Sequence, residues 1–193
     1  MAGNFYIALL HYPVYNKHGE VVTTAVTNMD VHDIARAALT YGVKRFYIVT
    51  PILVQRQLVA KIMQHWQQGY GAIYNPARRE ALQIADIKSS LDEVLDDVAG
   101  NEGIKPWLVA TGANLGGKLI TFRALRVRLR EESDAHLLMF GTGWGMAQQV
   151  LERADFFLES IKGAMPYNHL SVRSAVSIAL DRLWGEGADV DGH

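Results

Sequence analysis

The chain has 193 residues, of which 49% are hydrophobic and 20% charged, and its formal net charge is −1 at pH 7. This length predicts one sizeable domain, and the near-zero charge limits any nucleic-acid site to a local patch. The absence of cysteine excludes disulfides, zinc ribbons, iron–sulfur clusters and cysteine nucleophiles, and no apolar run reaches the roughly 20 residues that a membrane span needs.

The N-terminal half alternates apolar runs with helical patterns. Its predicted elements are a strand at Phe5–His11, a helix through residues 31–42, a strand at Arg45–Thr50, a long helix through residues 52–68, and short helices at Arg78–Ala85 and Leu91–Val98. Asn28 and Asp30 are the candidate N-caps of the first helix. The N-terminal segment has no basic flank and no small-residue cleavage site, so we expect a cytoplasmic protein.

The C-terminal half continues the alternation. Its predicted elements are a strand at Trp107–Thr111, a helix at Leu119–Glu132, a strand at His136–Phe140, a helix from Met146 to about Ala154, a strand at Phe156–Leu158 and a helix at Ser171–Trp184. Within the helix predicted at Leu119–Glu132, the segment RVRLR also has the alternating pattern of a strand. Strands that alternate with helices predict an α/β fold with a mostly parallel sheet and helices on both faces. We expect one domain over residues 1–184 and a flexible tail over 185–193.

Ligands of open α/β sheets bind outside the carboxyl ends of the strands, where this chain has three distinctive loops. In the first, Gly112 to Lys118 matches the phosphate-binding pattern G-x-x-x-x-G-K. That pattern requires a serine or threonine next, because its hydroxyl binds Mg²⁺, whereas this chain has Leu119. The residues therefore disfavour a nucleoside-triphosphate site and leave a mobile glycine-rich surface loop as the common alternative.

The second loop, FGTGWGM, covers residues 140–146. Gly141 and Gly143 fit the dinucleotide fingerprint G-x-G-x-x-G, but its third position is Met146, and Gly145 comes one place early. Three glycines still let the backbone approach a flat ligand closely. A tight turn before a helix explains the same residues equally well.

The third loop, together with the helix that it leads into, covers residues 159–183. Gly163 and Pro166 predict an unusual backbone path, and Tyr167, Asn168 and His169 bring three polar side chains together. A histidine in such a loop is more often a structural hydrogen-bonding group than a base. The cluster at the carboxyl edge of a sheet nevertheless indicates a candidate site. Ser171 is the candidate N-cap of the last helix.

Two segments of the second half, LLMFGTGWGMA and IKGAMPYNHLSVRSAVSIALDRL, resemble a small family of RNA methyltransferases in the SPOUT (α/β-knot) superfamily. This family is related to tRNA (guanine-N1) methyltransferase and uses S-adenosylmethionine (SAM). TNMDVHDIARAALTYGVKRFYIVTP and HWQQGYGAIYNPARREAL fit the same family, so the resemblance reaches to about Trp184. It implies a C-terminal deep trefoil knot, a homodimer with the site near the interface, and tRNA or rRNA as the methyl acceptor.

The resemblance also implies the site residues. Those expected to bind SAM are Thr111, Gly112, Phe140, Gly141, Gly143, Gly145, Ile161, Gly163, Tyr167, Asn168, His169 and Leu170. Those expected to orient or activate the acceptor are Asn28, Arg36, His169 and Arg173. Three of them have a further structural alternative: Asn28 as a helix cap, Arg36 on a solvated helix face, and Arg173 in an ion pair with Asp181 or as a cap of a nearby group. Transfer of a sulfonium methyl group needs no metal, and we expect none.

The acceptor is less well defined than the cofactor. The most basic stretch, RALRVRLR, places Arg123, Arg126 and Arg130 on one helical face, but acidic residues follow at once. A solvated surface is the usual explanation of such a run, and an RNA contact is the alternative. An RNA methyltransferase is therefore the leading hypothesis. A SAM-binding knot protein without turnover, acting as a partner or regulator, is the second, and a nucleotide-binding enzyme that uses the first loop is the third.

Overall fold

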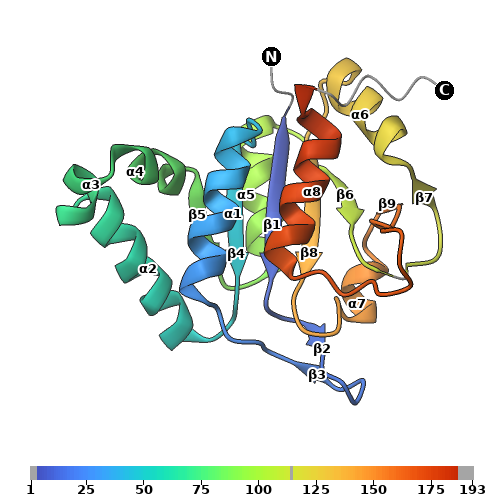
Figure 1. Cartoon of the computed structure of the whole chain (residues 1–193), viewed down its shortest axis with the longest axis horizontal. Helices are drawn as coiled ribbons and strands as arrows, with labels where there is room; N and C mark the ends of the chain where they lie inside the picture. Colours follow the sequence, from blue (N-terminus) through green and yellow to red (C-terminus); the bar gives the residue numbers. More distant parts are fainter. Residues whose placement is uncertain (1–3, 114, 187–193) are drawn as a thin grey trace.

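The computed structural model describes residues 4–113 and 115–186, and its main feature is a seven-stranded sheet in which every pairing is parallel (Figure 1). The strands of this sheet are β1 (Phe5–Leu10), β4 (Arg45–Val49), β5 (Ala85–Lys88), β6 (Trp107–Ala110), β7 (Leu119–Ile120), β8 (His136–Gly141) and β9 (Phe156–Leu158). Their spatial order is β5-β4-β1-β8-β6-β9-β7. β2 (Val14–Tyr15) and β3 (Val21–Val22) form a separate antiparallel hairpin. The predicted α/β class with a parallel sheet is confirmed.

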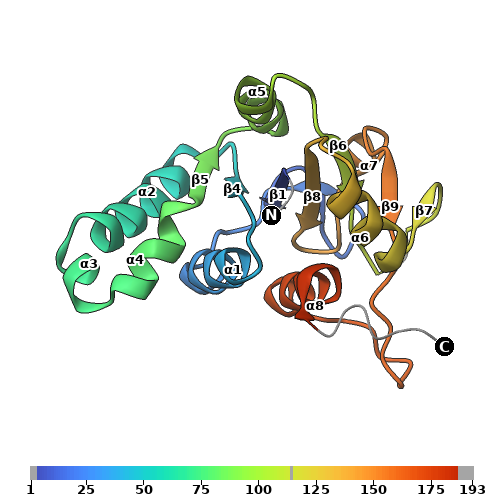
Figure 2. The same ribbon diagram turned by 90° about the horizontal axis from the view of Figure 1, so that it is seen from above.

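Helices cover both faces of the sheet (Figure 2). They are α1 (Asn28–Thr40), α2 (Leu53–Gln67), α3 (Tyr70–Tyr74), α4 (Pro76–Gln83), α5 (Leu91–Glu102), α6 (Phe122–Glu131), α7 (Gln148–Leu151) and α8 (Val172–Trp184). α1 and α8 lie on one face of the central strands and α5 lies on the other, whereas α2, α3 and α4 extend beyond the edge strand β5. Among the described residues, no helix combines the length and the apolarity that crossing a bilayer requires.

The central strand β1 supplies side chains to two cores, which is why the sheet is covered twice. All six of its residues are buried. Successive side chains of a strand point to opposite faces. Phe5, Ile7 and Leu9 accordingly pack with residues of α1 and α8, while the alternate residues pack with α5 and α7. An apolar run without polar alternation is typical of a parallel strand buried on both faces.

Two helix starts test the predicted N-caps. Ser171 caps α8 as predicted, because its hydroxyl accepts a hydrogen bond from the Ser174 N–H at 3.3 Å. The prediction that Asn28 or Asp30 caps α1 is wrong. The cap is Thr27, which has extended backbone angles and accepts from the Asp30 N–H at 3.1 Å, so that Asn28 is already helical.

Tertiary contacts shorten two predicted helices. The helix predicted at Leu119–Glu132 begins only at Phe122, because Leu119 and Ile120 pair with β9 as strand β7. The helix predicted from Met146 to Ala154 is confined to α7, because Met146 forms a bridge with Val14 of the hairpin. Both contacts join residues far apart in the chain, and a local pattern contains no sign of them.

Several short helices and strands of the structure were not predicted from the sequence. The helix predicted at Arg78–Ala85 is α4, which starts two residues earlier with Asn75 as its cap and Pro76 at its first position. The chain then enters strand β5, whose pairing with β4 had no counterpart in the prediction. α3 and the β2–β3 hairpin were also missed, because each is only a few residues long. Most of the predicted flexible tail, residues 187–193, lies outside the described residues.

Candidate functional site

The three predicted loops lie at one edge of the sheet. Because all strands of the sheet run in the same direction, the carboxyl ends of β6, β8 and β9 meet there. The loop after β6 begins at Thr111, the loop after β8 at Thr142, and the loop after β9 at Glu159. The sheet thus gathers predicted cofactor residues that are up to 59 positions apart, from Thr111 to Leu170.

The first loop is tied to the strand ends beside it. Thr111 donates both its N–H (3.1 Å) and its hydroxyl (2.9 Å) to the Met139 carbonyl of β8. Ser160, which follows β9, donates its hydroxyl to the carbonyls of Gly112 (3.2 Å) and Ala113 (2.7 Å). The start of the first loop and the chain after β9 are therefore in direct contact.

The lysine of the same loop lies over an aromatic ring. The Lys118 ammonium lies 4.4 Å from the centre of the Phe156 ring, a cation–π contact. Leu119, at the position where a triphosphate site needs a hydroxyl, pairs with β9. Both observations count against the nucleotide-binding alternative.

The second loop requires glycine at particular positions. Gly143 (φ 61°) and Gly145 (φ 105°) have left-handed backbone angles that other residues adopt at a cost. A Cβ on Gly143 would lie 2.7 Å from the Tyr15 carbonyl oxygen, and one on Gly141 would lie 2.6 Å from Cγ of Met146. The Tyr15 carbonyl also accepts the Trp144 N–H at 2.9 Å, so the loop is held against the β2–β3 hairpin.

The remaining predicted residue of this loop, Phe140, has its side chain in the core, with only 3% exposed. It can therefore offer a ligand only its backbone. Trp144, which was not predicted, is 60% exposed although it is large and mainly apolar. Tryptophan is highly buried on average, so this exposed ring beside the second loop is a candidate ligand contact.

The third loop contains several predicted cofactor residues and is mostly exposed. Tyr167 is 76% exposed and its ring contacts that of His169, with centroids 5.3 Å apart. Leu170 is also exposed, as is the unpredicted Met165, whereas Ile161 is partly buried against the core. Gly163 is exposed and Asn168 is half-buried. Three large side chains with apolar surface are thus gathered on a loop next to the first one.

The predicted acceptor-side residues lie on two neighbouring helices. The Arg173 guanidinium of α8 lies 3.5 Å from the carboxylate of Asp30 and 3.5 Å from that of Asp33, both on α1. Asn28 and Arg36 are exposed on the same helix. The alternative pairing of Arg173 with Asp181 is wrong, because the Asp181 carboxylate accepts the Tyr41 hydroxyl instead.

A buried polar group at this edge was not predicted from the sequence. His11 directly follows β1 and is fully buried, and its Nδ1 lies 3.0 Å from the Thr24 hydroxyl. The Thr24 hydroxyl contacts that of Thr142 in the second loop, which in turn donates to the Leu10 carbonyl at 3.1 Å. The position of a histidine at the end of a predicted buried strand was the signal that could have identified it.

The environment of His11 keeps its imidazole neutral at pH 7. Burial lowers the pKa of His11 to about 4, and the nearby Asp30 carboxylate opposes that shift. Its Nε2 atom is buried and has no hydrogen-bond partner among the described residues. His11 thus contacts the second loop through Thr24, and its pKa responds to the charge of Asp30, which Arg173 also contacts.

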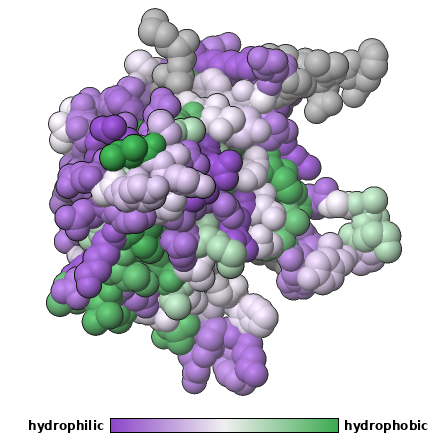
Figure 3. All heavy atoms as spheres, turned by 60° about the vertical axis from the view of Figure 1, so that its left-hand side comes forward, coloured by the Kyte–Doolittle hydropathy of each residue, from purple (hydrophilic) through white to green (hydrophobic). Residues whose placement is uncertain are grey.

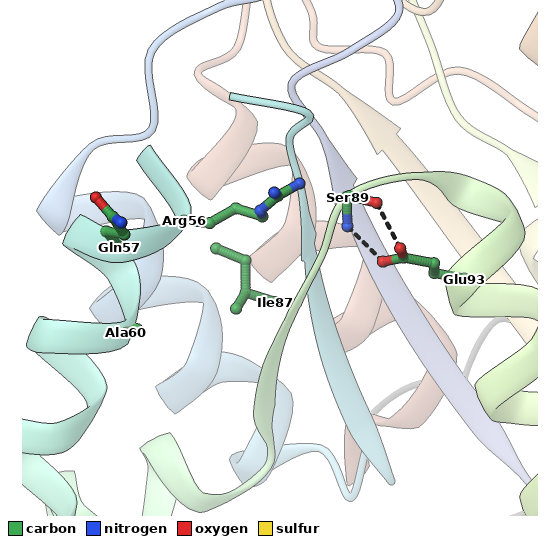
Figure 4. Close-up of a pocket in the computed structure, with 6 residues that line it drawn as sticks. All are labelled: Arg56, Gln57, Ala60, Ile87, Ser89 and Glu93. Carbon is green, nitrogen blue, oxygen red and sulfur yellow. Dashed lines mark hydrogen bonds between the residues drawn. The ribbon is translucent and has the colours of Figure 1, made fainter. Parts of the chain in front are cut away.

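A separate hollow of about 430 Å³ opens at the same edge, beside β5 and between α2 and α5 (Figure 4). Arg56 reaches into it from α2, and Glu93 on the opposite side accepts the N–H and the hydroxyl of Ser89. These hydrogen bonds, the side-chain one first, lower the pKa of Glu93. None of the predicted cofactor residues lines this hollow, so it is distinct from the three loops.

Two arginines of the run on α6, Arg126 and Arg128, make contacts within the protein. Arg126 donates to the Arg182 carbonyl of α8, and Arg128 lies over the rings of Trp107 and Phe156. Arg128 also pairs with Glu132 at 2.8 Å. These contacts favour the structural explanation for Arg126, whereas Arg123 and Arg130 of the same predicted face are exposed.

The chain has relatives among known proteins. The profile of a family described as SAM-dependent RNA methyltransferase matches residues 4–185. An uncharacterized protein of Aquifex aeolicus is 40% identical over 181 residues, which are 94% of this chain and 88% of that protein. A tRNA (guanine-N(1)-)-methyltransferase of Oleidesulfovibrio alaskensis is 42% identical over 183 residues, which are 95% of this chain but only 42% of the relative.

The fold also occurs in solved structures. A SpoU methyltransferase of Streptomyces viridochromogenes, solved in complex with the cofactor AdoMet, superposes with a TM-score of 0.59 at 15% identity. The superposition covers 100% of this chain and 61% of that protein. At this identity the likeness establishes the fold, and it agrees with the resemblance to the SPOUT superfamily.

Proposed function

The chain belongs to the family of SAM-dependent RNA methyltransferases, and we propose that its three carboxyl-edge loops form the SAM site. The residues proposed to hold the cofactor are Thr111, Gly112, Phe140, Gly141, Gly143, Gly145, Ile161, Gly163, Tyr167, Asn168, His169 and Leu170. The observation that carries the proposal is the second loop, where Gly143 and Gly145 have left-handed backbone angles and no atom lies within 4 Å of the Cβ position of Gly145, so the backbone is open there.

The chemistry of the loops fits SAM. The adenine ring is flat and largely apolar, and it is bound where backbone comes close and apolar side chains cover it. Trp144, Met165, Tyr167 and Leu170 are large side chains left exposed around these loops. The surrounding backbone N–H and carbonyl groups suit the polar edges of adenine and ribose.

Residues of α1 and α8 are proposed to act on the acceptor. When bound, SAM supplies an electrophilic methyl group, which leaves its sulfur as the acceptor atom bonds to it. Arg173, held by Asp30 and Asp33, and Asn28 on the same helix would orient the acceptor by hydrogen bonds. Arg36 would bind RNA phosphate, and His169 would take the proton from an acceptor atom that carries one.

We propose that the C-terminal segment forms the trefoil knot. β9 lies between β6 and β7 in the sheet, although it follows both of them in the chain. The connection from β6 to β7 must therefore pass the carboxyl end of β9, and Ser160 contacts this connection at Gly112 and Ala113. α8 then returns to pack against α1. This course supports a chain that passes through the loop after β6, within one domain over residues 1–184.

We also propose a homodimer. Four large apolar side chains are exposed near the starts of α1 and α2: Met29 (58%), Leu53 (57%), Val54 (72%) and Leu58 (49%). The Val26 N–H donates to Gln55 at 2.9 Å and so holds the segment before α1 against α2. A patch of this kind is a feature of protein interfaces. It lies at the carboxyl edge of the sheet, as does the proposed SAM site.

The acceptor we propose is tRNA or rRNA, and tRNA comes first because the Oleidesulfovibrio alaskensis relative is a tRNA (guanine-N(1)-)-methyltransferase. The test combines calorimetric titration of SAM with transfer of a labelled methyl group from SAM to tRNA and rRNA fractions. Saturable SAM binding with label in one RNA fraction is the expected result. SAM binding without transfer to any RNA would favour the alternative of a partner or regulator, and a folded protein that binds no SAM would refute the proposed site.

A further inference from the structure

The helices α2, α3 and α4, called here the α2–α4 lobe, have a charge that differs from that of the whole chain. Residues 53–83 contain four basic residues, Arg56, Lys61, Arg78 and Arg79, against one acidic residue, Glu80. The whole chain has 19 basic and 20 acidic residues. Arg56 lies at the start of α2, and the Arg78 guanidinium lies 4.5 Å from the centre of the Trp66 ring, so Lys61 and Arg79 are the basic groups that the far end of the lobe exposes. A local basic site is what a near-neutral RNA-binding protein needs.

Helix α3 exposes the side chains that a helix normally buries. Its buried residues are the small Gly71 and Ala72, whereas Tyr70, Ile73 and Tyr74 are 73%, 80% and 75% exposed. This arrangement follows from close packing on α2. A Cβ on Gly71 would lie 2.6 Å from the Trp66 ring, so the glycine side of α3 is pressed against α2 and the large residues face outward.

The two tyrosines form an aromatic surface beside polar groups. The Tyr70 and Tyr74 rings are stacked, with centroids 6.1 Å apart and planes at 25°. Next to Tyr70 in the chain is a hollow of about 490 Å³ that is lined by Lys61, Gln64, His65, Gln68 and Gly69. Lys61 and Arg79 are exposed, and within the described part of the chain neither forms an ion pair.

Figure 3 shows the side of the molecule on which the lobe comes forward. This side is mainly hydrophilic, and its largest hydrophobic area lies lower down, with smaller ones above it and to the right. The exposed apolar residues at the start of α2, assigned above to the dimer, are distinct from the aromatic and basic groups at its far end. The two ends of α2 thus present different chemistry.

We propose that the α2–α4 lobe binds a single-stranded segment of the RNA substrate. Unpaired bases would stack on Tyr70 and Tyr74, while Lys61 and Arg79 contact phosphates and the amides of the hollow contact base edges. Stacking on exposed aromatic rings beside basic groups is how proteins bind single strands, whereas the bases of a duplex are already stacked and cannot reach such rings. The lobe lies at the opposite end of the long axis from the third loop (Figure 1), so it anchors the RNA away from the reacting nucleotide. The inference rests on the proposed function, because it takes RNA to be the substrate.

The test measures binding of a labelled oligouridylate and of an RNA duplex of equal length to the full chain by fluorescence anisotropy, with SAM titration of the same samples. The Tyr70→Ala/Tyr74→Ala variant should bind the oligouridylate roughly 5- to 150-fold more weakly for each base that it no longer stacks. Tyr70→Phe/Tyr74→Phe should restore the affinity, because it keeps both rings. Duplex binding and SAM binding should be the same in all three proteins.

A charge variant gives a second, independent readout. Lys61→Ala should make the slope of log affinity against log salt shallower by about 0.7. Lys105→Ala, an exposed lysine before β6 at the opposite edge of the sheet, should leave the slope unchanged. Unchanged oligouridylate affinity in the Tyr70→Ala/Tyr74→Ala variant would overturn the proposal. If that variant also changed the self-association of the protein, the lobe would bind a protein partner instead of RNA. RNA binding by the lobe in a protein that binds no SAM would leave the proposal standing and refute the SAM site instead.

Discussion

Replacing Gly143 with alanine examines the proposed cofactor loop at its tightest point. The substitution places a Cβ on a residue with φ 61° and only 2.7 Å from the Tyr15 carbonyl oxygen. The left-handed backbone of an L-residue costs about 1–2 kcal/mol, and displacing backbone in a packed region adds about 1–3 kcal/mol. We expect Gly143→Ala to be less stable by about 2 kcal/mol or more, which lowers Tm by roughly 4–8 °C in a chain of this size.

The same substitution should weaken SAM binding at least tenfold. The Tyr15 carbonyl that the new methyl group displaces also holds the Trp144 N–H, so the whole loop has to move. Thermal unfolding and calorimetric titration measure the two effects. Gly103→Ala is the matched control: its φ is 74°, but no atom lies within 4 Å of the added Cβ, and it ends α5 at the opposite edge of the sheet. It should lose about 1 kcal/mol and bind SAM normally. A Gly143→Ala protein with wild-type SAM affinity would refute the reasoning.

The remaining predictions concern pH, the acceptor side and assembly. Burial lowers the pKa of His11 to about 4, below its unfolded value of about 6.5. Between these pH values the unfolded chain binds more protons than the folded protein. The free energy of unfolding therefore falls as the pH falls from 6.5 to 4. The loss amounts to about 3 kcal/mol near pH 4, and denaturant titrations should find a smaller loss in His11→Gln; equal losses would contradict the assignment. Arg173→Ala should reduce the rate of methyl transfer at least tenfold and leave SAM affinity unchanged. Its free energy of unfolding should change by no more than about 1 kcal/mol, because the ion pairs of Arg173 are partly exposed. An unchanged transfer rate would remove Arg173 from the acceptor site. Val54→Glu should give a monomer in analytical ultracentrifugation, and a wild-type protein that is already monomeric would contradict the proposed dimer.

The local pattern of apolar residues was sufficient to predict the main strands of the sheet and the positions of the loops that follow them. The runs at Phe5–His11 and His136–Phe140 have no polar alternation, and a parallel strand buried on both faces is what accommodates such a run. Glycines directly after a predicted strand then place flexible backbone at the carboxyl edge of the sheet. The second loop follows β8 in the structure, as predicted, with Gly143 and Gly145 in left-handed conformations.

The relations between distant segments were decided only by the tertiary structure. Nothing near Phe156 indicates that its strand lies between β6 and β7, and nothing near Arg173 indicates that its partners are Asp30 and Asp33 rather than Asp181. The exposure of Tyr70 was equally hidden, because it depends on Gly71 packing against Trp66. Periodicity reports which faces of a segment are apolar, since that depends on spacing along the chain. Which surface covers each face depends on contacts between residues tens of positions apart, and only the folded chain contains them.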